Sequence, residues 1–313
     1  MQQQEFQNST SKYPILSRVN SPKDLKKLSR KELKALAQDI RNKIIEVVSK
    51  TGGHLGGPLG AVELTIALHY IYNAPYDKIV LDTGHQSYPH KLITGRRDNF
   101  HTLRQYKGVC GFCNIEESEY DVFGAGHAST AISAALGIAK ARDYKKEKNK
   151  IIAVVGDGAL TAGLAFEGLN NTGSLKSDIL IILNDNRMSI SPNVGAISEY
   201  LNKIVLHPGY FELKKKTENI LKKIPGIGES GAKKLIKAEE RIRTLGNDGV
   251  FFESLGFQYF GPIDGHNLDE LIPALQNIKN LKGIMEKEKI PSMANLIKCI
   301  KRNFDFPRVR GWT

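Results

Sequence analysis

Acidic and amide side chains follow two apolar runs in the middle of the chain. The run 151–155 ends in Gly156-Asp157-Gly158, and the run 179–183 ends in Asn184-Asp185-Asn186. A carboxylate and an amide oxygen are hard donors that suit Mg²⁺ and leave coordination positions for phosphate oxygens. The glycines allow a ligand to approach the backbone, and a helix that starts after them would favour a phosphate. The pattern fits a metal-bound diphosphate site, but also a plain strand–helix turn followed by a polar loop.

The elements that must position these side chains read as a βαβ unit. The runs 151–155 and 179–183 are short, apolar and rich in β-branched residues, which is typical of buried parallel strands. Between them, 159–173 has apolar residues at helical spacing and ends at Gly173. Ligands of open α/β sheets bind outside the carboxyl ends of the strands. The sequence therefore predicts the α/β class, with an open, mostly parallel sheet, helices on both faces and a ligand site at Asp157.

Other parts of the chain predict further elements around this unit. Ser21-Pro22 opens a helical pattern that continues to Val48 with a break near Ser29. A buried helix is expected over 61–72, a short strand over 79–81, and a helix over 129–143 capped by Ser129 and Thr130. Near the end of the chain, 257–260 is expected as a strand and 268–281 as a helix.

Length and composition limit the possible classes of protein but do not identify a function. A chain of 313 residues can form one large α/β domain or two smaller ones. The excess of 45 Lys and Arg over 33 Asp and Glu favours anionic partners, which include phosphorylated substrates, a diphosphate cofactor and nucleic acid. No apolar run approaches the roughly 18 residues of a membrane span. The N-terminal segment lacks the apolar core of a signal peptide, so a cytoplasmic location without membrane partners is expected.

Several reactive or basic residues leave alternatives open. Cys110 and Cys113 could be a redox pair or half of a zinc site, but no second pair at zinc spacing accompanies them, so a structural loop is favoured. Arg96 and Arg97 are read as phosphate binders or solvated charges, with solvated charges favoured. His266 either faces the site or has a structural role in its loop.

The two polar clusters resemble the thiamine-diphosphate signature of the transketolase-like enzymes. Six further blocks, in the same order along the chain, resemble the 1-deoxy-D-xylulose-5-phosphate synthase family within that group. The resemblance covers about residues 13–283 and implies the pyrophosphate-binding domain of the thiamine-diphosphate fold, with thiamine diphosphate and Mg²⁺ as cofactors. The blocks are 52–60 (GGHLGGPLG), 82–91 (DTGHQSYPHK), 94–98 (TGRRD), 118–121 (SEYD), 126–130 (GHAST) and 261–266 (GPIDGH).

This resemblance also implies roles for individual residues. Mg²⁺ would be held by the side chains of Asp157 and Asn186 and by the backbone carbonyl of Met188. His54 would be the catalytic residue, a proton-transfer group beside the thiazolium and substrate. The chain departs from the usual family residues at Gly57, Pro58, Ala128 and Arg187. The residues implied to bind the cofactor are His85, Gly126, His127, Ala128, Gly158, Ala159 and Asn186.

The activity implied by the resemblance belongs to a longer enzyme. That enzyme decarboxylates pyruvate and joins the two-carbon unit to glyceraldehyde 3-phosphate, which leads to isoprenoid precursors, thiamine and pyridoxal. Its second domain supplies a glutamate that activates the cofactor, and its third helps the dimer to form. This chain would carry the diphosphate–metal half, as a homodimer or together with a chain that supplies the missing domain. A non-catalytic truncated product or subunit is the alternative.

Two segments fall outside the resemblance or vary within it. Residues 199–245 are expected to form a lysine-rich helical insertion, in which 224–236 imitates a helix–hairpin–helix element that grips nucleic-acid phosphates. Because this is a single copy out of context, nucleic-acid binding through 221–243 is the disfavoured third hypothesis. Residues 284–313 are expected to be a divergent basic tail.

Overall fold

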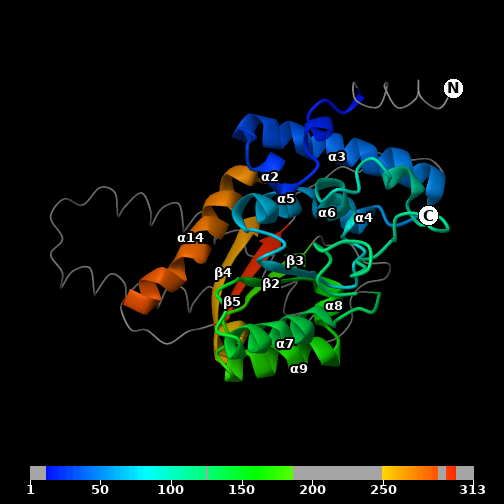
Figure 1. The fold of residues 1–313 in the computed structure, drawn as a ribbon. Helices are drawn as coiled ribbons and strands as arrows, with labels where there is room; N and C mark the ends of the chain where they lie inside the picture. Colours follow the sequence, from blue (N-terminus) through cyan, green and yellow to red (C-terminus); the bar gives the residue numbers. More distant parts are fainter. Residues whose placement is uncertain (1–11, 125, 186–248, 288–293, 301–313) are drawn as a thin grey trace, which may run out of the picture.

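Five parallel strands form one sheet at the centre of the molecule (Figure 1). The computed structural model describes residues 12–124, 126–185, 249–287 and 294–300. The spatial order of the strands is β1-β2-β3-β5-β4, and each neighbouring pair is parallel. The predicted open parallel α/β sheet is therefore confirmed. The strands are β1 (Lys78–Leu81), β2 (Ile151–Gly156), β3 (Leu180–Asp185), β4 (Phe257–Asp264) and β5 (Ala294–Ile300).

Helices cover both faces of this sheet, as predicted (Figure 1). Helices α7 (Ala131–Tyr144) and α9 (Gly163–Ser174) lie on one face, and α5 (Val62–Ile71) and α14 (Leu268–Lys287) on the other. Helix α3 (Arg30–Thr51) packs against α5 as a further layer. The shorter elements are η1 (Leu16–Arg18), α2 (Pro22–Leu25), α4 (Gly56–Gly60), α6 (Tyr88–Ile93), η2 (Phe100–Thr102), α8 (Asp157–Leu160) and α13 (Val250–Ser254).

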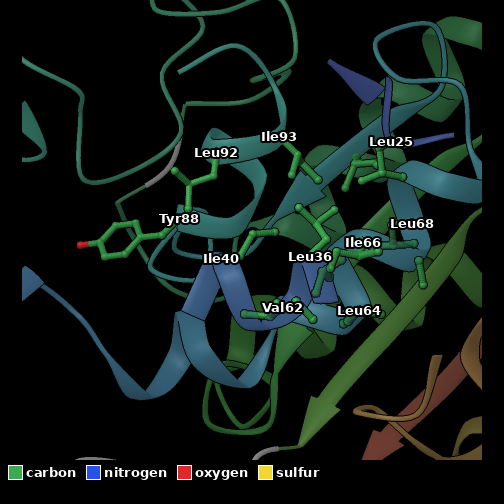
Figure 2. Close-up of a cluster of buried hydrophobic side chains, with 14 of the residues drawn as sticks. Leu25, Leu36, Ile40, Val62, Leu64, Ile66, Leu68, Tyr88, Leu92 and Ile93 are labelled. Carbon is green, nitrogen blue, oxygen red and sulfur yellow. The ribbon is translucent and has the colours of Figure 1, made fainter. Parts of the chain in front are cut away.

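Alternation along the strands divides the apolar core into two clusters. In β2, Ile152 and Val154 face the side of α5 and α14, whereas Ile151, Ala153 and Val155 face the side of α7 and α9. Successive side chains of a strand point to opposite faces, so a strand covered on both sides is apolar throughout. Part of the first cluster, in which α3, α5 and α6 meet, is shown in Figure 2.

Local sequence signals explain where several helices begin. The predicted break near Ser29 is confirmed, because Ser29 and Glu32 form a capping box at the start of α3. The predicted helix over 159–173 is interrupted, and α8 and α9 are separated by Thr161 and by Ala162, whose backbone is extended (φ −84°, ψ 149°). This short α8 leaves Asp157 in the first turn after β2.

The C-terminal part contains a strand that the sequence analysis did not predict. Helix α14 continues to Lys287, past its expected end at 281, and 294–300 forms β5 between β3 and β4. A central position allows β5 to pair on both sides, with Leu180–Asp185 and with Phe257–Asp264. The predicted insertion 199–245 and the end of the tail lie outside the described residues. Within the described ranges, no helix is both long and apolar enough to span a membrane.

Two helical glycines allow a matched test of this packing. A Cβ atom added to Gly173 in α9 would lie 1.8 Å from the carbonyl oxygen of Leu255, whereas one added to Gly137 in α7 would have nothing within 4 Å. We expect Gly173→Ala to destabilise the protein by about 1–3 kcal/mol through overpacking. Gly137→Ala should instead stabilise it by up to about 1 kcal/mol, because alanine is the better helix former. Urea unfolding of both variants checks this, and equal effects would contradict the close α9 contact.

Candidate functional site

The carboxyl ends of β1, β2 and β3 meet at one edge of the sheet. Gly156 at the end of β2 is paired with Asn184 in β3, which brings Asp157 beside the end of β3. The Asn184 side-chain amide donates a hydrogen bond of 2.7 Å to the buried Gln86, which follows β1. Three strand ends are thereby fixed together around the predicted metal ligand Asp157. The other two predicted ligands, Asn186 and Met188, lie outside the described residues.

The loop Gly126-His127-Ala128 is tied to the turn after β2. The Ser129 hydroxyl donates to the Ala159 carbonyl oxygen at 2.7 Å, and this contact brings the predicted cofactor loop next to Gly158 and Ala159. His127 and Ala128 are exposed, and a Cβ atom added to Gly126 would meet nothing within 4 Å. The loop therefore borders open space at the same sheet edge as Asp157.

The start of α7 differs from the prediction. Neither Ser129 nor Thr130 caps it with a side chain: Ser129 has a left-handed backbone (φ 74°), and the capping position, Thr130, makes no such bond. The buried carboxylate of Asp82 accepts instead, from the amides of Ser129 (2.8 Å) and Ala131 (3.1 Å). Because a carboxylate already satisfies these two amide donors, they are not free to bind a phosphate.

The His85 ring packs against Gly57, at the start of the helix α4 that follows His54. A Cβ atom added to Gly57 would be 2.5 Å from Cδ2 of His85, so this position accepts a side chain only if the ring moves. Burial, and then the nearby His54, lower the pKa of His85 below its usual value. Its buried Nδ1 atom has no hydrogen-bond partner within the described part of the chain. A buried polar atom without a partner is costly, so Nδ1 has the capacity for one further hydrogen bond.

His54 is held in one protonation form by its neighbours. Its ring lies 5.8 Å from that of His85, and its Nδ1 atom is 2.9 Å from Nη2 of Arg104. Burial, and then the Arg104 charge, lower the pKa of His54 below its usual value. A guanidinium group can only donate, so Nδ1 accepts and the neutral ring carries its proton on Nε2. His54 therefore presents an N–H donor on the side away from Arg104.

Tyr88 and Phe112 complete the surroundings of His54. The Tyr88 hydroxyl accepts from the His54 backbone amide (3.3 Å) and from Arg104 Nε (3.0 Å). In Figure 2, the same hydroxyl points away from the apolar cluster that buries the ring. The Phe112 ring lies 6.0 Å from the His54 ring and 5.1 Å from the guanidinium carbon of Arg104.

Four contributors to this arrangement were not predicted from the sequence. Gln86 and Tyr88 lie inside a block quoted for the family resemblance, so adjacency to His85 was a usable signal. Arg104 and Phe112 lie in the loop 100–121, which shows no periodicity, and no local pattern brings them to His54.

Arg96 and Arg97 are neither phosphate binders nor solvated charges, so both interpretations from the sequence are wrong. Arg96 is buried and forms ion pairs with Glu117 (3.0 Å) and Asp121 (2.8 Å). Arg97 donates to the carbonyl oxygens of Leu16 (3.1 Å), Ser17 (2.6 Å) and Val19 (3.1 Å). These residues are neither solvated charges nor placed for phosphate, because protein acceptors already hold their guanidinium groups.

His266 lies against a buried ion pair. His266 Nδ1 lies 2.8 Å from the buried carboxylate of Glu63, which is also paired with Arg41, so the contacts of His266 are structural.

Cys110 and Cys113 are both free, and burial raises the pKa of the Cys113 thiol to about 12. A thiol with so high a pKa is a poor nucleophile and metal ligand. Across the described ranges, no group of three or more His, Cys, Asp or Glu side chains is placed to hold a metal.

The Arg104–His54 contact predicts a measurable titration. Replacing Arg104 with methionine removes the charge next to Nδ1, so we expect the pKa of His54 to rise towards about 6.5. Histidine NMR signals followed against pH would measure it. Lys107→Met, in the same loop, is the control and should leave the His54 titration unchanged. An unchanged titration in Arg104→Met would show that the Arg104 charge does not lower the pKa of His54.

Comparison with known proteins decides the family. A family model described as 1-deoxy-D-xylulose-5-phosphate synthase, N-terminal part, matches residues 16–285. The chain belongs to the 1-deoxy-D-xylulose-5-phosphate synthase family. It is 56% identical over 269 residues to the synthase of Caldanaerobacter subterraneus subsp. tengcongensis, covering 86% of this chain and 43% of that protein. Against the Alkaliphilus oremlandii synthase it is 55% identical over 271 residues, covering 87% of this chain and 43% of that protein. The chain thus spans about two-fifths of the curated relatives that it matches.

Solved structures of transketolases share the fold with this family member. A transketolase mutant from Pichia stipitis matches with a TM-score of 0.59 at 15% identity, over 86% of this chain and 36% of that one. The transketolase of Campylobacter jejuni matches with a TM-score of 0.56 at 19% identity, over 87% and 38%. These likenesses agree with the transketolase-like α/β fold implied by the sequence blocks.

Proposed function

We propose that this chain supplies the diphosphate–metal half of the active site of a 1-deoxy-D-xylulose-5-phosphate synthase. The observation that carries the proposal is the junction of three strand ends, closed by the Gln86–Asn184 hydrogen bond beside Asp157. Strand ends of an open parallel sheet are where such folds bind nucleotides and diphosphates. Family membership supports the choice of reaction over other uses of the same fold.

Asp157 and the loop 126–128, together with residues 186 and 188 outside the described ranges, would hold thiamine diphosphate and Mg²⁺. Asp157 and Asn186 would hold the metal through their side chains, and Met188 through its backbone carbonyl, which makes an all-oxygen donor set of the kind that Mg²⁺ prefers. The unpartnered Nδ1 of His85 and the open loop Gly126-His127-Ala128, with Gly158 and Ala159, would face the cofactor. When bound, thiamine diphosphate supplies the carbanion chemistry of the decarboxylation.

His54 would act as a hydrogen-bond donor rather than as a base. Its Nδ1 is directed at the Arg104 guanidinium, which opposes protonation at that atom. Its Nε2–H is therefore the atom able to hold a substrate oxygen by a hydrogen bond. Arg104, Tyr88 and Phe112 fix the ring so that this N–H keeps one direction.

The substrates and assembly of the whole enzyme belong to this proposal. The relatives are named for 1-deoxy-D-xylulose 5-phosphate, which pyruvate and glyceraldehyde 3-phosphate form with release of CO₂. The half-site that activates the cofactor would come from a region beyond the matched part of those relatives. A homodimer, or a partner chain that carries this region, and a cytoplasmic location complete the proposal. The nucleic-acid hypothesis rests on 221–243, outside the described residues, and no observation elsewhere favours it.

A complementation experiment tests this function. The 313-residue chain would be assayed with pyruvate, glyceraldehyde 3-phosphate, Mg²⁺ and thiamine diphosphate, alone and with the part of the Caldanaerobacter synthase that it does not match. We expect binding of the cofactor by the chain alone and turnover only in the mixture. Turnover in the mixture should disappear with Asp157→Ala. Absence of cofactor binding by the folded chain would overturn the proposal, and binding without turnover in the mixture would favour the non-catalytic alternative.

A further inference from the structure

A network of buried charges lies next to the segment that contains Phe112. The Lys91 side chain is fully buried, and its ammonium group pairs with Glu117 and, at 3.5 Å, with Asp121. Arg96 reaches both carboxylates, and His90 Nε2 lies 2.9 Å from Asp121. Although burial alone would raise it, the hydrogen bond from His90 and the charges of Arg96 and Lys91 lower the pKa of Asp121 below its usual value. The Asp121 carboxylate is thus held ionised.

The same two carboxylates hold the backbone of one short segment at both ends. Glu117 accepts from the Cys110 amide at 2.6 Å, and Asp121 accepts from the Asn114 amide at 2.9 Å. A charged acceptor makes a stronger hydrogen bond than a neutral one, particularly where water is excluded. We call residues 110–114 the clamped segment.

The clamped segment presents its middle residues to the site. Phe112 lies over Arg104 and next to His54. Gly111 lies so close to Arg104 that an added Cβ atom would be 2.7 Å from its Nε. A shift of this segment would therefore move Phe112 away from His54 and Gly111 away from Arg104 at the same time.

We propose that Glu117 and Asp121, held by Lys91 and Arg96, are positioning residues that fix the clamped segment so that Phe112 and Arg104 hold His54 in place. This inference deepens the proposed function, because it rests on that function for the role of His54. Its structural content is independent of any cofactor. The groups that face the His54 ring in the described structure are Arg104, His85 and Phe112, with the Tyr88 hydroxyl on its backbone amide.

Glu117→Asp is the decisive variant, because it keeps the charge next to Lys91 and Arg96 but shortens the side chain that reaches the Cys110 amide. Glu116→Asp, the same change at the exposed neighbouring residue, is the matched control. Phe112→Ala removes the aromatic ring that lies next to His54. The full chain, without cofactor or substrate, would be titrated by NMR of its histidine rings, with His54→Asn used to assign the signal.

We expect Glu117→Asp and Phe112→Ala each to raise the pKa of His54 by about 0.5 unit or more, because water reaches the ring and Arg104 moves away. Glu116→Asp should leave it unchanged. A role limited to stability would lower the melting temperature of Glu117→Asp without moving this titration, and that result in a folded variant would overturn the proposal.

Hydrogen exchange of the wild-type chain provides a second test that needs no variant. The amides of Cys110 and Asn114 should exchange slowly, because both donate to carboxylates. Fast exchange at either amide would overturn the proposal even if Glu117→Asp failed to fold. Since neither measurement uses thiamine diphosphate, a failure of cofactor binding would count against the proposed function and leave this inference standing.

Discussion

Asp157→Ala should abolish the Mg²⁺-dependent stabilisation of this chain by thiamine diphosphate. Asp157 is the predicted metal ligand in the first turn after β2, beside the paired ends of β2 and β3. A ligand at 100 times its dissociation constant stabilises the folded state by about 2.7 kcal/mol. For a domain of this size we expect a rise of about 5 °C or more in the melting temperature of the wild-type chain. The variant should show no rise, because the diphosphate would have no metal to bridge it to the protein.

Calorimetric melting with thiamine diphosphate measures this effect, in Mg²⁺ and in EDTA. Asp269→Ala is the matched control, because Asp269 lies on the surface of α14 in an exposed pair with Lys34. That variant should respond to the cofactor as the wild type does. If Asp157→Ala gained the same stability as Asp269→Ala, the assignment of Asp157 to the metal would be wrong. Stabilisation that persists in EDTA would show that the cofactor binds without the metal.

Lys91→Met should destabilise the folded chain by about 3–5 kcal/mol, as expected when one partner of a buried ion pair is removed. Methionine nearly preserves the volume of the side chain, so most of the loss would be electrostatic. The fully buried ammonium group offsets the charges of Glu117 and Asp121, both of which also accept from backbone amides. Without it, the two carboxylates would share the charge of Arg96, beside the hydrogen bonds from His90 and from the two backbone amides.

Urea unfolding would measure this loss against the same substitution on the surface. The Lys34 side chain is 57% exposed in its pair with Asp269, whereas that of Lys91 is 0% exposed. Lys34→Met should cost no more than about 1 kcal/mol, because water screens an exposed pair. Comparable losses in the two variants would mean that water reaches the Lys91 cluster.

The sheet and the meeting of polar residues at its edge were predictable because they depend on local patterns. Apolar runs over 151–155 and 179–183 specify buried strands, and the parallel connection places the polar residues after both runs at one edge of the sheet. The resemblance of short blocks to the synthase family then assigned His54 and His85 to the site. The sequence did not predict β5, because Asn295 and Lys298 interrupt its apolar run and its place depends on pairing with β3 and β4.

The sequence by itself determined the α/β class, the family and the residue types at the ends of β2 and β3. Only the tertiary structure decided how the site is held. His54 meets Arg104 across 50 positions of the chain, Asp82 caps α7 from the end of β1, and Lys91 is buried against Glu117. These contacts join residues far apart in the chain, so neither spacing nor propensity encodes them. Their energy comes from desolvated charges and hydrogen bonds that exist only after the chain has closed.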